Sequence, residues 1–128
     1  MAKKKQDLID LFEEAFGNYP GSKLVEPLKE GACLQATVDG TCIKGEKRGR
    51  DFLISEGELD NPDISVELNR AACEYMAGSQ ELDDFVVRAR ECIEQKHGDC
   101  YMTYEFNAGV TRLILKGYLD FARMLRVI

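Results

Sequence analysis

The residues best suited to chemistry in this 128-residue chain are its thiols, its single histidine and a run of carboxylates. Cys92, His97 and Cys100 form a Cys-x4-His-x2-Cys pattern, which offers three side chains of the kind that bind zinc. Structural zinc sites use four ligands and usually include a Cys-x2–4-Cys pair. A metal or thiol site is therefore the weaker hypothesis. We expect both cysteines to lie in the core and His97 to lie on the surface at a helix end.

Catalysis by a cysteine would need a base beside the thiol and a carboxylate that orients the base. Nothing in the spacing brings His97 to any of the five cysteines. Their number is odd and no Cys-x-x-Cys occurs, so reduced, mostly buried thiols in a cytoplasmic protein fit better than a disulfide framework. The sequence thus predicts a protein that is not an enzyme and that has no catalytic residues, metal or cofactor.

Four carboxylates follow one another closely in the middle of the chain, and paired carboxylates can act as general acid and base. They are Glu56, Glu58, Asp60 and Asp63. Their place at a strand end and in a turn is more typical of a solvated sheet edge, where charge prevents pairing with another sheet. We therefore expect this acidic patch to face water.

The net charge of −6 argues against nucleic acid as a partner, because phosphate binding depends on clustered Lys and Arg. A weak basic cluster contains Lys44, Lys47, Arg48 and Arg50. Gly45 and Gly49 bound a charged segment within it, which indicates a solvated loop, and a mouth for an anionic head group is the alternative. No stretch approaches the roughly 20 uncharged apolar residues of a transmembrane segment.

The periodicity of apolar residues predicts the elements that would position these side chains. Alternation predicts strands over residues 33–38, 41–44, 51–59, 64–68 and 100–106. Asp39-Gly40 separates the first two, and this residue pair favours a two-residue hairpin turn. Helical spacing predicts helices over 4–16, 70–77, 80–96 and 108–128, with a short one within 22–29. Separate runs of strands and helices indicate a single α+β domain over 1–128. We expect a mostly antiparallel five-stranded sheet covered by helices on one face.

The closing segment, with Asn107 as its expected N-cap, is unusually apolar for one surface helix. Its charges form a narrow stripe that should face water: Arg112, Lys116, Asp120, Arg123 and Arg126. Apolar residues from Val110 to Ile128 fill an arc of roughly 200°, whereas a helix that covers one face of a core needs only about 100°. The surplus must contact a neighbouring helix, a bound apolar ligand or a partner chain.

Residues 56–68 read Glu-Gly-Glu-Leu-Asp-Asn-Pro-Asp-Ile-Ser-Val-Glu-Leu, a turn followed by a Pro-Asp-hydrophobic-x-hydrophobic strand. A short helix that ends at a glycine follows, here 69–78, and then a second helix, a final strand and an apolar closing segment. In the order and spacing of these elements the chain resembles the sterol carrier protein 2 (SCP2) family. The resemblance implies an α+β fold around an apolar tunnel, binding of sterols, fatty acids or acyl-CoA, and no catalytic residues.

The favoured hypothesis is a small carrier that sequesters a fatty acid, acyl-CoA or sterol-like ligand between the sheet and the closing helix. A cavity on the order of a few hundred Å³ is the expected use of the surplus apolar surface, and Tyr118 could orient a head group. The candidate lining residues are Phe85, Val86, Ala89, Met102, Phe106, Ile114, Tyr118, Phe121 and Leu125. The alternative is an interaction module that forms a homodimer through the closing helix.

Overall fold

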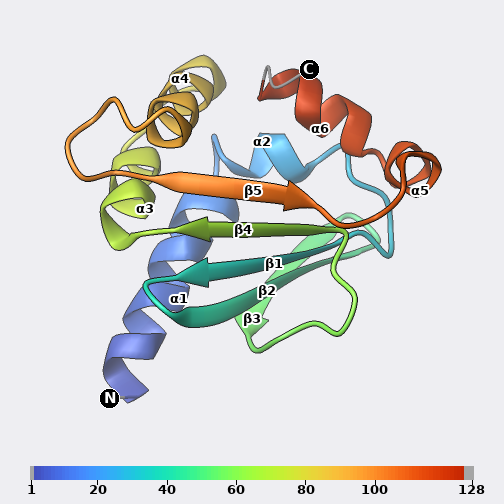
Figure 1. Ribbon diagram of the computed structural model, residues 1–128, viewed down its shortest axis with the longest axis horizontal. Coiled ribbons are helices and arrows are strands. Elements are labelled where there is room, and N and C mark those ends of the chain that lie inside the picture. Colours follow the sequence, from blue (N-terminus) through green and yellow to red (C-terminus); the bar gives the residue numbers. More distant parts are fainter. Residues whose placement is uncertain (1, 126–128) are drawn as a thin grey trace.

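The fold is built around a five-stranded sheet in the computed structural model, which describes the backbone of residues 2–125 and the side chains of residues 6–125 (Figure 1). The strands are β1 (Cys33–Val38), β2 (Thr41–Arg48), β3 (Asp51–Glu56), β4 (Ile64–Leu68) and β5 (Met102–Phe106). Their order across the sheet is β3-β2-β1-β4-β5. β1 and β4 pair in parallel, and the other pairings are antiparallel. The prediction of a mostly antiparallel sheet is therefore confirmed, although the sheet is mixed.

One face of the sheet is apolar and the other is polar, as the alternation in the sequence predicts. In β1 every second residue, beginning with Leu34, is buried, while the residues between are only partly covered. The register aligns Leu34 with Gly45 of β2 and with Ile64 of β4. Ile64 in turn aligns with Phe106 of β5. Because side chains two residues apart share a face, one apolar surface runs across these strands.

Helices cover the apolar face of the sheet (Figure 1). They are α1 (Ala2–Phe16), α2 (Ser22–Val25), α3 (Arg70–Ala77), α4 (Leu82–Ile93), α5 (Val110–Leu115) and α6 (Tyr118–Met124). α1 packs on α3, β2 and β3, and α4 packs on α3 and β5. Asn69 caps α3, because its side-chain oxygen accepts a hydrogen bond from the Ala72 N–H at 2.9 Å. No described helix has the length and apolar character that crossing a bilayer requires.

The hairpin of β1 and β2 shows one correct prediction and one wrong one. Asp39 and Gly40 have positive φ angles of 47° and 84°, which suit a tight two-residue hairpin turn. The basic cluster does not form the expected solvated loop, because β2 continues through it in register with β3. Lys47 therefore points to the inner face, where it is buried. Its ammonium donates hydrogen bonds to the carbonyls of Val25 and Glu26, both at 3.2 Å.

The closing segment is not one helix, so the prediction of a continuous helix over 108–128 is wrong. α5 ends at Leu115, and Gly117 has a φ of 87°, a left-handed conformation that glycine adopts freely. A side chain at this position would overlap the backbone carbonyl of Pro27. The break therefore lets the chain pass close to the segment after α2 and sends α6 in a new direction (Figure 1).

The start of the closing segment also differs from the prediction. Asn107 does not cap a helix, because Gly109 is the residue before α5. The side-chain amide of Asn107 instead donates a hydrogen bond to the Ser65 hydroxyl oxygen at 2.7 Å, which holds the chain against β4. The last three residues of the predicted helix, 126–128, which include Arg126 and Ile128, lie outside the described residues.

Candidate functional site

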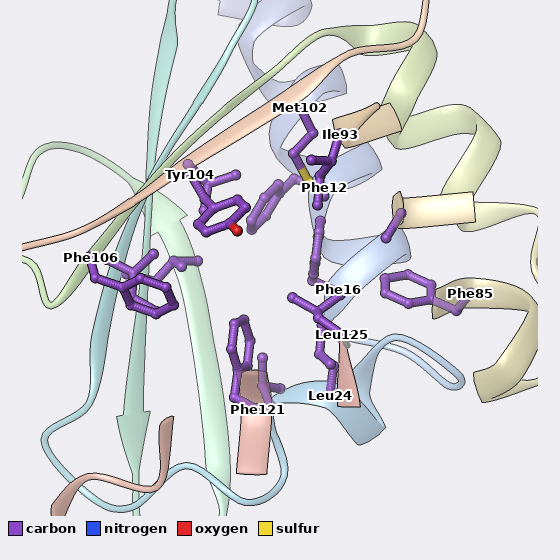
Figure 2. Close-up of a pocket in the computed structure, with 15 residues that line it drawn as sticks. Phe12, Phe16, Leu24, Phe85, Ile93, Met102, Tyr104, Phe106, Phe121 and Leu125 are labelled. Carbon is purple, nitrogen blue, oxygen red and sulfur yellow. The ribbon is translucent and has the colours of Figure 1, made fainter. Parts of the chain in front are cut away.

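An apolar pocket lies between the sheet and the helices, next to β5 (Figure 2). Its walls come from the inner face of the sheet, from α1, α2 and α4, and from the end of the closing segment. They contain Phe12, Phe16, Leu24, Val25, Leu34, Ile64, Val66, Phe85, Ala89, Ile93, Met102, Tyr104, Phe106, Phe121 and Leu125. The labelled side chains surround a common space, and none of the lining residues is charged.

The pocket is small because aromatic rings fill most of the available space. Phe12 and Phe16 stack with their ring centroids 4.7 Å apart, and Phe16 meets Phe85 edge to face at 5.6 Å. The volume that remains is about 40 Å³. Pockets for drug-sized ligands span about 300–1,000 Å³. The expected cavity of a few hundred Å³ is therefore not open in this structure.

The pocket reaches the surface at the free edge of the sheet. β5 is an edge strand, and its inward residues Tyr104 and Phe106 line the pocket. They nevertheless keep 40% and 36% of their surface exposed. Their rings contact each other edge to face, with centroids 5.7 Å apart. The helical layer thus leaves this end of the apolar face incompletely covered.

A buried carboxylate ties the closing segment to the sheet. Asp63 directly precedes β4, and its side chain has no exposed surface. The carboxylate accepts hydrogen bonds from the Cys33 N–H at 3.0 Å and from the Lys116 ammonium at 3.1 Å. Arg112 forms an ion pair with it at 3.0 Å. The Tyr118 hydroxyl lies 3.1 Å from the carboxylate and 3.1 Å from the Cys33 carbonyl oxygen. We call these five residues the Asp63 cluster.

The electrostatics of the Asp63 cluster favour a charged carboxylate and neutral partners on β1 and α6. Burial opposes the charge of Asp63, but hydrogen bonds from the Cys33 N–H and from Lys116 hold the pKa of this carboxyl below its ordinary value. Burial raises the pKa of the Tyr118 phenol, and the charge of Asp63 raises it further. Burial likewise raises the pKa of the Cys33 thiol. A protonated thiol is a poor nucleophile, so the cluster suits a structural clamp.

The acidic patch predicted to face water therefore divides in two. Glu56, Glu58 and Asp60 are exposed, whereas for Asp63 the prediction is wrong. The prediction that Lys116 faces water is also wrong, since only 22% of its side chain is exposed. The Pro-Asp-hydrophobic motif marked Asp63 in the sequence. Its partner Lys116, however, lies 53 residues further along the chain, a separation that no local pattern reveals.

The structure also places the other residues considered for chemistry. Cys92 and Cys100 are both buried, and burial, with the Cys100 thiol beside it, raises the pKa of Cys92 to about 12. The exposed His97 ring stacks on Tyr75, with centroids 3.8 Å apart. Within residues 2–125, no group of three or more His, Cys, Asp and Glu side chains is arranged to hold a metal ion.

Comparison with solved structures places this architecture among known folds. The chain is similar to a protein named "UbiJ-SCP2 Ubiquinone synthesis protein", with a TM-score of 0.51 and 11% sequence identity over 98% of this chain and 97% of the other. The chain has an SCP2-like fold. No protein-family model matches the sequence, and no curated protein matches it. At this identity the likeness concerns the fold, and it agrees with the resemblance seen in the order of elements after residue 56.

The SCP2-like fold brings six of the nine predicted lining residues to the pocket: Phe85, Ala89, Met102, Phe106, Phe121 and Leu125. The other three lie elsewhere. Val86 is buried in α4 beside the pocket, and Tyr118 is buried in the Asp63 cluster. Ile114 is 51% exposed, because the break at Gly117 separates α5 from α6. Binding of a ligand by the six remains a prediction.

The sequence did not predict that α1 and α2 form one wall of the pocket in this SCP2-like fold. Phe12 and Phe16 of α1 and Leu24 and Val25 of α2 all line the pocket. The helical spacing of apolar residues over 4–16 correctly predicted the apolar face of α1, which includes Phe12. That spacing does not show which part of the sheet the helix covers, because packing between distant segments decides it.

The homodimer also remains a prediction, but the residues that could form it have changed. Phe121 is buried within the protomer, so it is not available to a partner chain. In the described part of the closing segment, the exposed large apolar residues are Val110, Ile114 and Leu115, all in α5.

Proposed function

We propose that this protein is a non-enzymatic carrier that holds an apolar, lipid-like molecule in the pocket beside β5. The observation that carries the proposal is the lining. Fifteen side chains, none of them charged, converge on one space that reaches the surface at Tyr104 and Phe106. Such a pocket suits a ligand that is bound by burial of apolar surface and recognised by shape.

The ligand class follows from the pocket, with support from the named neighbour. A fatty acyl chain and a prenylated quinone are both long, flexible and apolar, and the neighbour with this fold is named as a ubiquinone synthesis protein. A flexible chain can pass between aromatic rings, whereas a rigid, compact ligand needs a wide cavity. We therefore favour an extended chain as the part of the ligand that enters the pocket.

Binding requires the pocket to widen, because about 40 Å³ does not hold an acyl chain. The wall best suited to move is α6, which has seven residues and directly follows the left-handed Gly117. α6 contributes Phe121, and its C-terminal cap Leu125 also lines the pocket. An outward shift of α6 would move both side chains away from β5, while the Asp63 cluster holds the start of the helix.

Burial of the ligand supplies the energy for this change. An extended chain that buries about 400 Å² of apolar surface gains on the order of 10 kcal/mol at roughly 25 cal/mol per Å². Ordering of the ligand and displacement of the aromatic rings oppose this gain. Micromolar binding corresponds to about 8 kcal/mol, so it requires these opposing costs to total roughly 2 kcal/mol.

We propose that the protein binds its ligand and does not convert it chemically. The Cys33 thiol, which belongs to the Asp63 cluster, has a raised pKa and is held beside the carboxylate of Asp63. The positive charges of Arg112 and Lys116 are directed at the same carboxylate. These groups satisfy one another, which supports a structural role for the Asp63 cluster in fixing α5 and the first residue of α6.

Two measurements test the proposal. Lipids extracted from the purified protein are identified by mass spectrometry. The delipidated protein is then titrated with a naturally fluorescent polyene fatty acid, which a soluble prenylated quinone should displace. If no lipid co-purifies and no displaceable binding occurs, the carrier function is wrong.

A matched pair of variants locates the binding site. Ala89 is buried on the pocket wall, so Ala89→Leu should fill the remaining space and weaken binding by about tenfold or more. Val87 is exposed on the same helix, and Val87→Leu should bind like the wild type. Thermal melting shows whether both variants are folded. Equal affinity in folded Ala89→Leu would place the ligand outside this pocket.

A further inference from the structure

Exposed apolar side chains gather in one short part of the chain. Among the described residues, eight large apolar side chains are exposed, and five of them fall within residues 104–115. These five are Tyr104, Phe106, Val110, Ile114 and Leu115. The first two border the pocket mouth on β5, and the other three belong to α5, which follows β5 directly in the chain (Figure 1). The concentration contrasts with the scattered single residues that ordinary protein surfaces expose.

α5 is attached to the protein by one side only. Arg112 pairs with Asp63, and Leu113 packs against the core. At 100° per residue, Val110, Ile114 and Leu115 lie on the opposite side of the helix. They are 73%, 51% and 67% exposed. The Asp63 cluster therefore holds α5 in place with its apolar side directed outward.

The size of this surface argues against a second copy of the chain as its occupant. A stable protein interface buries about 800 Å² on each partner. Three aliphatic side chains on a six-residue helix provide much less, even when the exposed parts of Tyr104 and Phe106 are added. Insertion into the interfacial region of a lipid bilayer needs no such area, because each inserted apolar side chain contributes separately to binding.

The charges near α5 complement a lipid surface as well. Residues 110–116 contain two cationic residues, Arg112 and Lys116, and no acidic one, in a chain whose net charge is −6. Their side chains keep 43% and 22% of their surface exposed. Both pair with buried Asp63, so α5 itself presents no net negative charge to a lipid surface. Long cationic side chains can reach lipid phosphates while their apolar stems remain beside inserted residues.

We propose that α5 and the adjoining edge of β5 form a docking face for a lipid bilayer surface, placed beside the mouth of the apolar pocket. This inference rests on the proposed carrier function, since it identifies the surface from which the ligand would enter. Val110, Ile114 and Leu115 enter the interfacial layer, and the exposed part of Arg112 lies at the level of the head groups. Tyr104 and Phe106 then face the membrane, and an acyl or prenyl chain reaches the pocket without crossing bulk water.

Flotation with vesicles of phosphatidylcholine and phosphatidylglycerol in a four-to-one ratio tests this face. The wild type should float with the vesicles. The triple variant Val110→Ser/Ile114→Ser/Leu115→Ser should partition at least about tenfold more weakly, because it removes three inserted side chains. The matched control Leu53→Ser/Val87→Ser changes exposed apolar residues elsewhere and should float like the wild type. Wild type that does not float, or a triple variant that floats equally well, would overturn the docking face.

A second measurement separates this inference from the carrier function. The fluorescent fatty acid is delivered in monomeric form, without vesicles, to the triple variant. Unchanged affinity together with lost flotation is the expected result, since the substituted residues do not line the pocket. If the wild type does not bind the fatty acid, the carrier function is overturned, whatever flotation shows. Sedimentation equilibrium addresses the rival occupant: a wild-type dimer that the triple variant abolishes would assign α5 to a second copy and overturn the membrane proposal.

Discussion

α5 and α6 are neighbours in the chain and similar in length and apolar content, yet they occupy opposite environments. α6 buries Tyr118, Phe121 and Ala122, whereas α5 has no buried residue. Gly117 separates them with a left-handed turn. The turn divides one wide apolar arc into two narrow ones that point in different directions. An apolar pattern therefore indicates that a surface has to be covered, but it does not indicate which surface meets the core.

The largest effect is expected from a substitution in α6, the buried helix of this pair. Phe121→Asp places a charge among the apolar residues of the pocket, where Phe121 is only 8% exposed. We expect the free energy of unfolding to fall by about 4 kcal/mol, because a large side chain is lost and a charge is buried. Ile114→Asp, on exposed α5, should change it by less than about 0.5 kcal/mol. Urea denaturation of both variants measures the difference, and similar losses would contradict the contrast between the helices.

The next largest effect is expected when the Asp63 carboxylate, to which both helices are attached, is removed. Asp63→Asn leaves Arg112 and Lys116 without their carboxylate and should lower the free energy of unfolding by about 3 kcal/mol. The partial exposure of both cations keeps the loss at the lower end for a buried ion pair. Asp60→Asn, three residues earlier and exposed, is the control and should change little.

The same carboxylate predicts a dependence of stability on pH. Hydrogen bonds from the Cys33 N–H and from Lys116 hold the pKa of Asp63 in the folded protein below its ordinary value. A depressed pKa contributes stability that is fully present above the unfolded value and is lost as the pH falls through the folded value. The wild type should therefore lose stability more steeply than Asp63→Asn below about pH 4. Parallel urea midpoints for the two proteins between about pH 6 and pH 3 would contradict this assignment.

A smaller effect tests the turn that separates the helices. Gly117→Ala introduces a side chain at a φ of 87° and against the Pro27 carbonyl. We expect a loss of about 2 kcal/mol, from the left-handed strain and from the displaced neighbour. Gly109 lies at the other end of α5 with a φ of −67° and open space around it, so Gly109→Ala should be close to neutral. Thermal melting compares them, and an unaffected Gly117→Ala would show that the turn does not depend on glycine.

The smallest effect is expected from substitutions in α5, the exposed helix of the pair. Val110→Ser and Leu115→Ser should each change the free energy of unfolding by less than about 0.5 kcal/mol, because both side chains are mostly exposed. Chemical denaturation measures the two single variants against the wild type. A loss near 2 kcal/mol for either one would mean that α5 packs on the protein more closely than its exposure indicates.

Most strands were predictable from the sequence because their signals are local. The alternation in Ile64–Leu68 and the Asp39-Gly40 turn need only their nearest neighbours, and both appear where expected. Helix existence was likewise predictable from spacing, and the order of elements was sufficient to indicate the SCP2-like fold. Six of the predicted lining residues reach the pocket because they belong to apolar faces that a sheet covered on one side must bury.

The remaining features depend on contacts between distant parts of the chain. Lys47 points inward because of the register between β2 and β3, although its sequence neighbours suggest a charged loop. Asp63 is buried because Lys116, 53 residues away, compensates its charge. The size of the pocket depends on how Phe12 and Phe16 of α1 pack below β5, which spacing within α1 does not specify.

Local patterns in the sequence were thus enough to predict the strands, the apolar faces, the order of elements and the excess of apolar residues at the end of the chain. How that excess is divided depends on contacts between distant segments. The division at Gly117 depends on the close approach of Pro27, and the orientation of α5 depends on the carboxylate of Asp63. Periodicity reports which side of a helix is apolar, whereas a clash or an ion pair between remote segments sets where the helix breaks and which way each half faces.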